Sequence, residues 1–286
     1  MANLRCGTVT FTNIRAVIFD KDGTLADSQQ FLRNLAQRRS RLIDAEIPGV
    51  QEPLLMAFGV DQATIDPNGL MAVGTRFENE IAAAAYIAEA GRGWVEALNL
   101  ARRCFQEADR PTARKSDETP VFAGVEAVLK ELAIADLKLG ILSSDSTANV
   151  RDFVQNYHLE QYFSLLMGVD CPPSKPDPAL FHAACAQLQT APSETLMIGD
   201  SPADVQMAHV AGAAGCVGVT WGWAVPPALQ GATVLISECS ELQVLKSGQD
   251  LRSWTIFGGA PRPQKSSKHW VFRGQCVSPA GNGDAA

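Results

Sequence analysis

The sequence lacks three features that mark common functional classes. Its formal net charge is -7, so it has no basic excess to hold a phosphate backbone, and nucleic acid is not an expected partner. No stretch approaches the roughly 20 apolar residues of a membrane span, and the N-terminus has no continuous apolar run. We therefore expect a protein of the cytoplasm that has no membrane partner.

Paired cysteines are also missing. The seven cysteines lie far apart, at positions 6, 104, 171, 185, 216, 239 and 276, and none forms a Cys-x-x-Cys pair. Neither a zinc cluster nor a disulfide scaffold is indicated. We expect reduced thiols in the core.

What the sequence does contain is an alternation of short apolar, β-branched runs with segments of helical periodicity. The predicted strands are Ala16 to Phe19, Leu139 to Leu142, Phe163 to Val169, Leu196 to Ile198 and Cys216 to Thr220. The predicted helices are Val125 to Ala135, Ser146 to Tyr157, Pro178 to Leu188 and Pro202 to Ala211. This alternation predicts an α/β fold, a Rossmann-like doubly wound parallel sheet with helices on both faces.

About a hundred residues between the first strand and Val125 do not follow this alternation, which is too many for one crossover connection. Their periodicity predicts helices instead, with turn residues between them. These helices are Phe31 to Ile43, Pro53 to Phe58, Arg76 to Ala90 and Trp94 to Glu107. The sequence therefore predicts an inserted, all-helical cap domain.

These patterns predict three parts of the chain. Residues 1–27 and 115–247 form the α/β core, and residues 28–114 form the helical cap, with hinges just after Leu25 and within Asp109 to Thr119. Residues 248–286 form a loosely ordered C-terminal tail, because Gly258 to Ala286 is rich in Gly, Pro, Ser and Lys and lacks hydrophobic periodicity.

Two carboxylates follow the first predicted strand in the run Asp20-Lys21-Asp22-Gly23-Thr24-Leu25. The carboxyl edge of a parallel sheet is where α/β folds bind ligands. If the extended conformation continues, the strand period of two points Asp20 and Asp22 to the same side, and two such acids need a cation or a shared proton. Magnesium would meet that need. The alternative is a plain surface turn, for which Asp-Gly is a common dipeptide.

The longer run Val17-Ile18-Phe19-Asp20-Lys21-Asp22-Gly23-Thr24-Leu25 resembles the signature of the haloacid dehalogenase superfamily of phosphohydrolases. The resemblance implies three further motifs. The first is a strand that ends in Ser or Thr, and Leu139-Gly140-Ile141-Leu142-Ser143 fits it. Taken alone, Ser143 is more often a helix cap, but Asp145 and Ser146 can serve as caps instead.

The second motif is a lysine, which Ser174-Lys175-Pro176-Asp177-Pro178 supplies; a single lysine is otherwise usually a solvated surface charge. The third is an acidic turn after a buried strand, which Met197-Ile198-Gly199-Asp200-Ser201-Pro202-Ala203-Asp204 supplies; the alternative for its two aspartates is helix capping. The resemblance spans roughly residues 15–225.

The resemblance implies a magnesium-dependent phosphatase that acts on a small phosphorylated metabolite. Asp20 would be the nucleophile that becomes phosphorylated, and Asp22 the general acid and base. Ser143 and Lys175 would bind the phosphate. The ligands of Mg2+ would be Asp20, the backbone carbonyl of Asp22, and Asp200, while Asp204 would bind the metal through water or hold Lys175.

Within the superfamily, the chain is most similar to phosphoglycolate phosphatases, including the pair Trp221-Gly222 after the last parallel strand, so 2-phosphoglycolate is the expected substrate. Dehalogenases lack an acid at the position of Asp22, so Asp22 argues against dehalogenation. A sugar-phosphate phosphatase or phosphomutase remains an alternative, although the histidines, at 158, 182, 209 and 269, all lie outside the predicted cap. The alternative from another class is a non-catalytic phosphate-binding regulatory module. The sequence does not predict the oligomeric state.

Overall fold

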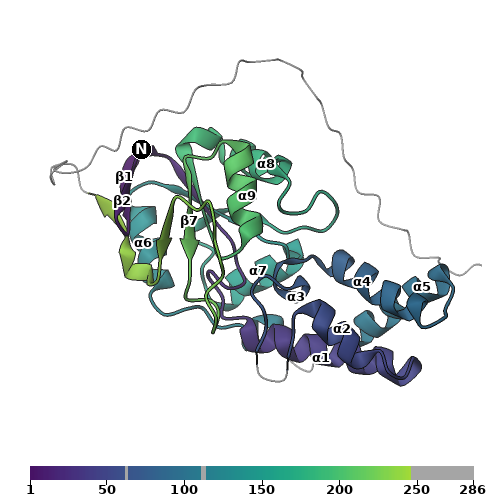
Figure 1. Ribbon diagram of the computed structural model, residues 1–286. Helices are drawn as coiled ribbons and strands as arrows, with labels where there is room; N and C mark the ends of the chain where they lie inside the picture. Colours follow the sequence, from purple (N-terminus) through teal and green to yellow (C-terminus); the bar gives the residue numbers. More distant parts are fainter. Residues whose placement is uncertain (62–63, 111–113, 246–286) are drawn as a thin grey trace, which may run out of the picture. The chain divides into compact units, whose positions relative to one another are not determined.

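A parallel sheet forms the central layer of the α/β part of the protein (Figure 1). The computed structural model describes residues 1–61, 64–110 and 114–245. The strand order is β5-β4-β3-β6-β7-β8, and every neighbouring pair is parallel. The strands are β3 (Ala16–Phe19), β4 (Lys138–Leu142), β5 (Phe163–Met167), β6 (Thr195–Gly199), β7 (Gly215–Val219) and β8 (Val234–Ile236).

Helices cover both faces of this sheet. The period of two along β3 sends Val17 and Phe19 into one apolar cluster and Ala16 and Ile18 into another. The first cluster includes α6 (Val125–Ile134) and α7 (Thr147–Asn156), and the second includes α8 (Pro178–Leu188) and α9 (Pro202–Ala211). The predicted doubly wound α/β fold is confirmed.

The helices α6, α8 and α9 begin at the predicted residues, and α7 begins one residue later than predicted, because proline and capping residues fix the first turns. Pro178 and Pro202 open α8 and α9, and Asp177 and Ser201 are the N-caps. Ser146 caps α7 by accepting a hydrogen bond from the backbone N–H of Asn149.

The segment between β3 and α6 is helical. Its helices are α1 (Gln29–Glu46), α2 (Gln51–Phe58), α3 (Leu70–Val73), α4 (Arg76–Glu89) and α5 (Trp94–Ala108). We call the described residues between 28 and 114 the helical insert. It has its own apolar cluster, in which Ile43, Leu54, Phe58, Ile87 and Phe105 are fully buried. The short helix α3 and an isolated bridge between Val60 and Ile65 were not predicted. The division into a core and a cap domain stays a prediction.

A second, antiparallel sheet was also not predicted. Its order is β2-β1-β9, with β1 (Ala2–Cys6), β2 (Val9–Ile14) and β9 (Leu242–Leu245). Its buried side chains, such as Leu4 and Leu242, join the apolar cluster of α6 and α7. The strand β1 thus pairs with the last described element of the chain.

The cysteines follow the prediction in part. Cys6, Cys104, Cys185 and Cys216 are free and buried, and Cys239 is free and half-buried. Cys171 is exposed and disulfide-bonded, so the prediction of a reduced core thiol is wrong for that residue. Cys276 and the predicted tail, residues 248–286, lie outside the described residues. No helix in the described ranges is long and apolar enough to cross a membrane.

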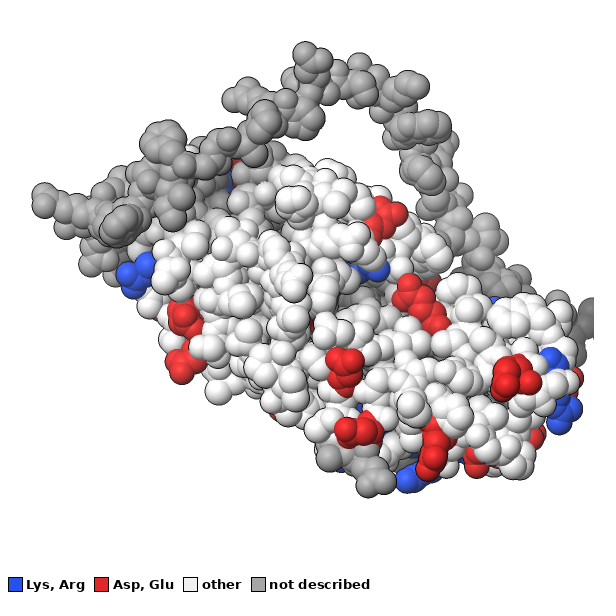
Figure 2. Space-filling view, viewed as in Figure 1, with Lys and Arg blue, Asp and Glu red and all other residues white. Residues whose placement is uncertain are grey.

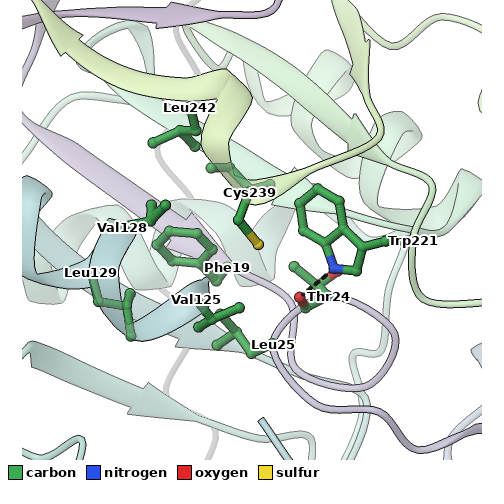
Figure 3. Close-up of a pocket in the computed structure, with 10 residues that line it drawn as sticks. Phe19, Thr24, Leu25, Val125, Val128, Leu129, Trp221, Cys239 and Leu242 are labelled. Carbon is green, nitrogen blue, oxygen red and sulfur yellow. Dashed lines mark hydrogen bonds between the residues drawn. The ribbon is translucent and has the colours of Figure 1, made fainter. Parts of the chain in front are cut away.

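A small apolar cavity lies under the loop that follows β3 (Figure 3). Its volume is about 20 Å³, and Phe19, Leu25, Val125, Leu129 and Trp221 are among the residues that line it. On one side the Trp221 indole Nε1–H donates to the backbone carbonyl of Thr24 at 3.1 Å. This cavity is too small for a metabolite. The residues that line it pack against the loop after β3.

We expect Leu129→Ala to lower the free energy of unfolding by about 3 kcal/mol. The substitution enlarges this cavity, and the surrounding residues can move into the added space only in part. Ile134→Ala on the same helix is the control. Ile134 is 77% exposed, so its truncation should change stability by less than about 0.5 kcal/mol. Urea unfolding of both variants measures the difference, and equal losses would contradict the packing described here.

Candidate active site and metal centre

Three neighbouring strands bring the predicted residues to one edge of the sheet. Asp20 follows β3, Ser143 follows β4 and Asp200 follows β6, and β3 lies between the other two strands. Parallel neighbours lie about 4.8 Å apart and end at the same edge, so their following residues converge. The backbone N–H of Asp20 continues the ladder by donating to the carbonyl of Ile198 at 2.8 Å.

Three carboxylates meet at this edge. One oxygen each of Asp20, Asp200 and Asp204 lies within 4.8 Å of the others, and the residues are 8%, 3% and 0% exposed. Buried like charges so close together are unfavourable unless a cation or a proton compensates them.

Lys175 supplies one positive charge to this group. Its Nζ lies 2.5 Å from Asp20 Oδ1 and 2.7 Å from Asp204 Oδ1, and the lysine is itself buried. Burial works against its charge, but the two aspartates raise the pKa of Lys175 well above its usual value. One ammonium group therefore pairs with two of the three clustered carboxylates.

The imbalance appears in the pKa values of the acids. Burial raises the pKa of Asp20 to about 6, against the lowering effect of Lys175. Burial, and then the neighbouring Asp20 and Asp204, raise the pKa of Asp200 well above its usual value. A set of clustered carboxylate oxygens with uncompensated charge fits Mg2+, which prefers hard oxygen ligands. Asp20 and Asp200 are side chains of this cluster that could hold it.

Asp204 already has protein partners on both oxygens. Its Oδ1 pairs with Lys175, and its Oδ2 accepts from the Ser201 hydroxyl at 2.6 Å and the Ser201 N–H at 3.3 Å. This arrangement closes the capping box of α9. Of the two alternatives for Asp204, the geometry favours the one in which it holds Lys175.

Two donors that sequence reasoning missed orient Asp200. The Thr24 hydroxyl donates to Oδ1 at 3.0 Å, and the Trp223 indole Nε1–H donates to Oδ2 at 2.5 Å. Gly23 makes room for this arrangement, because its φ is +82° and an added Cβ would lie 2.3 Å from Asp200 Oδ2. Gly222 packs so closely on Gly23 that its own added Cβ would lie 2.0 Å from the Gly23 carbonyl oxygen.

A second group of charges surrounds Asp22. Lys21 Nζ lies 2.6 Å from Asp22 Oδ1 and 3.2 Å from Asp145 Oδ2, while Lys115 Nζ lies 3.3 Å from Asp22 Oδ2 and 2.5 Å from Asp145 Oδ2. Two lysines thus face two carboxylates. Burial opposes ionisation of Asp22, but Lys115 and Lys21 lower its pKa below the usual value.

Sequence reasoning missed the group of Lys21, Lys115 and Asp145. Lys21 stands between the two acids of the first motif, so its position in the sequence was a usable signal. Lys115 lies in the 3-10 helix η1 (Lys115–Glu118), just after the helical insert, and its Nζ is 5.2 Å from the Phe31 ring of α1. Nothing in the local sequence connects Lys115 with Asp22.

Ser143 is 1% exposed and lies at the end of β4. Its Oγ accepts a hydrogen bond from the Asp145 backbone N–H at 3.1 Å, so its own hydroxyl proton is available to a ligand oxygen. Ser146, rather than Ser143, caps the following helix.

The helical insert contacts the edge of the site through Glu78. Its Oε1 accepts from the Ser174 hydroxyl at 3.1 Å, next to Lys175, and its Oε2 accepts from the Thr75 N–H at 2.6 Å. Arg76 is engaged within the insert by Glu80 and Asp109. Figure 2 shows acidic side chains scattered over the viewed face, where Lys and Arg do not gather into a patch.

A sequence model of the haloacid dehalogenase-like hydrolases matches residues 14–212. The phosphoglycolate phosphatase of Photorhabdus laumondii is 31% identical over 222 residues, which cover 73% of this chain and 82% of that protein. The phosphoglycolate phosphatase of Vibrio vulnificus strain CMCP6 is 28% identical over 216 residues, which cover 75% and 87%.

The fold is also similar to a solved structure. The crystal structure of a predicted phosphoglycolate phosphatase from Haemophilus somnus 129PT superposes with a TM-score of 0.60 at 22% identity. The match covers 80% of this chain and 96% of that one. At this identity the likeness concerns the fold alone.

We expect Asp200→Asn to raise the melting temperature of the metal-free protein at neutral pH. The raised pKa of Asp200 means that its ionised form costs folding free energy at neutral pH, and the amide removes that charge. The variant should also lose the further stabilisation that Mg2+ gives the unaltered protein. Thermal melts with and without Mg2+ test both effects. A Mg2+-induced shift of unchanged size would contradict the metal centre.

We expect Asp145→Asn to lower stability by about 3 kcal/mol at neutral pH, because it leaves Lys21 and Lys115 with one carboxylate in place of two. Lys115 and Lys21 hold the pKa of Asp145 well below its usual range, although burial opposes this. The stabilisation is therefore present above the unfolded pKa and is lost as the pH falls through the folded pKa.

Urea unfolding at pH 7 measures this loss. Asp117→Asn is the matched control, because Asp117 is exposed. A loss no larger than that of the control would show that the four-charge group does not stabilise the fold.

Proposed function

This chain belongs to the haloacid dehalogenase-like hydrolases and is a phosphatase, and we propose that it hydrolyses a small phosphomonoester with Mg2+ through an aspartyl-phosphate on Asp20. One observation carries the proposal. The buried carboxylates Asp20, Asp200 and Asp204 cluster at the carboxyl edge of the sheet, and Lys175 pairs with Asp20 and Asp204. A further acid, Asp22, follows Asp20 two residues later.

The site residues divide the work of phosphoryl transfer, which consists mainly of positioning and charge stabilisation. Asp20 is the nucleophile. Lys175 and the hydroxyl of Ser143 bind the oxygens of the phosphoryl group and offset its charge. Asp20, Asp200 and the backbone carbonyl of Asp22 would hold Mg2+, which when bound would supply positive charge against the repulsion between nucleophile and phosphate.

Asp22 moves the protons. In the first half-reaction a carboxylate oxygen of Asp20 bonds to phosphorus, the ester P–O bond breaks, and protonated Asp22 gives its proton to the leaving alcohol oxygen. In the second, Asp22 takes a proton from water, the water oxygen bonds to phosphorus, and the bond to Asp20 breaks. Phosphate leaves, and both acids return to their starting forms.

The helical insert, residues 28–114, is in this proposal the cap that closes over the site and selects the substrate. The relatives are named phosphoglycolate phosphatases, so 2-phosphoglycolate is the first substrate to test. A cytoplasmic location and the lack of nucleic-acid and membrane partners stay predictions.

Two alternatives remain. A sugar-phosphate phosphatase or phosphomutase would use the same core, and hydrolysis rates for phosphoglycolate, sugar phosphates and nucleotides would separate these substrates. A non-catalytic phosphate-binding module would bind phosphate without turnover. Asp22 favours the enzyme, because a pure binder needs no proton donor for a leaving group.

We expect Asp20→Asn to lower kcat for an aryl phosphate in the presence of Mg2+ by roughly a thousandfold or more, because the amide cannot form the acyl phosphate. EDTA should abolish turnover of the unaltered protein, and added Mg2+ should restore it. Asp117→Asn serves as the control and should keep its turnover. Retained turnover in Asp20→Asn, with thermal melts showing a folded protein, would rule out Asp20 as the nucleophile.

A further inference from the structure

The indole of Trp223 links two parts of the molecule. Its Nε1–H donates to Asp200 Oδ2 at 2.5 Å, inside the candidate metal centre. Trp223 is only 6% exposed and belongs to the apolar cluster of the helical insert, together with residues such as Phe31 and Leu54. Among the clustered buried residues of the α/β part, Trp223 is the one that the structure assigns to the insert's cluster.

The residues next to Trp223 contact the loop after β3 on one side and the helical insert on the other. Trp221 donates to the Thr24 carbonyl, and Gly222 lies against the backbone of Gly23. On the other side, the backbone N–H of Ala224 donates to the side-chain carbonyl of Gln29, the first residue of α1, at 2.8 Å. The segment 221–224 therefore contacts both the loop after β3 and the helical insert.

We propose that Trp223 is a positioning residue for the metal ligand Asp200, and that through it Mg2+ binding is coupled to the packing of the helical insert. The proposal rests on the proposed metal centre. It adds a residue outside the four motifs and a link between metal affinity and the insert.

The chemistry of the indole supports this role. An indole N–H can only donate, so it fixes one oxygen of Asp200 as an acceptor, while Thr24 holds the other at 3.0 Å. Both bonds restrict the rotation of the carboxylate and favour its charged form. Hydrogen bonds from outside the ligand set commonly change metal affinity by 10- to 100-fold.

The coupling follows from the two contacts of one rigid side chain. If the insert holds the indole ring in place, it also holds the donor that orients Asp200. Linkage is reciprocal, so Mg2+ bound at Asp200 must stabilise the same packing of the insert. A phenylalanine at position 223 would keep most of the apolar contact and lose the donor.

The test compares Trp223→Phe with the unaltered full-length protein by isothermal titration calorimetry with MgCl2. We expect the Kd for Mg2+ to rise about tenfold. Trp94→Phe is the control, because Trp94 lies 49% exposed on α5, and its Kd should not change. A Kd for Trp223→Phe within twofold of the unaltered protein would overturn the positioning role, whatever happens to its melting temperature.

Hydrogen exchange tests the coupling. In the unaltered protein, Mg2+ should slow exchange in peptides from α1 and α2, and in Trp223→Phe the same saturation with Mg2+ should slow it less. Equal protection in both proteins, or none in the unaltered protein, would overturn the coupling.

A measurement on the unaltered protein covers the case in which Trp223→Phe does not fold. In 1H–15N spectra, Mg2+ should shift one indole N–H resonance, and traces of paramagnetic Mn2+ should broaden that same resonance. If no indole resonance responds, the proposal fails. Phosphate release from an aryl phosphate, measured in parallel, separates this outcome from failure of the proposed function, because the metal affinities do not depend on turnover.

Discussion

An unbalanced buried charge is the constraint on which the site depends. Asp20, Asp200 and Asp204 bring three carboxylates to the edge of the sheet, and Lys175 offsets only part of their charge. Such an arrangement lowers the free energy of unfolding unless a further cation binds. The protein tolerates it because each carboxylate is held by strand ends, a helix cap or a hydrogen-bond donor that fixes its place. The folding cost and the affinity for a divalent cation thus have the same physical origin.

The second charge group differs in its balance. Lys21 and Lys115 match Asp22 and Asp145 one for one, so this group needs no outside ion. The two acids of the first motif therefore lie in opposite electrostatic settings, although one residue separates them. Environment sets their pKa values apart, with that of Asp20 raised and that of Asp22 lowered. The lowered pKa keeps Asp22 as a carboxylate, the form that takes a proton from water in the proposed second half-reaction, so the proposed first half-reaction requires that Asp22 gain a proton when substrate binds.

Much of this arrangement was predictable from sequence because its signals are local. Strand ends and helix starts follow from apolar runs and from prolines such as Pro178 and Pro202, and the predicted bounds of α8 and α9 agree with the structure. The carboxyl edge then collects Asp20, Ser143 and Asp200. What was missed depends on contacts between distant segments. The strand β1 pairs with β9 across almost the whole described chain, and Lys115 reaches Asp22 from beyond the helical insert.

The contact between Gly222 and Gly23 has a consequence for how this sequence can vary. A Cβ at position 222 would lie 2.0 Å from the Gly23 carbonyl oxygen, and a Cβ at position 23 would lie 2.3 Å from Asp200 Oδ2, so neither position has room for a methyl group. Neither glycine carries a reactive group, yet a library randomised at either position would return few active clones. Two positions without any chemistry of their own therefore limit the variation of the site through the space around them.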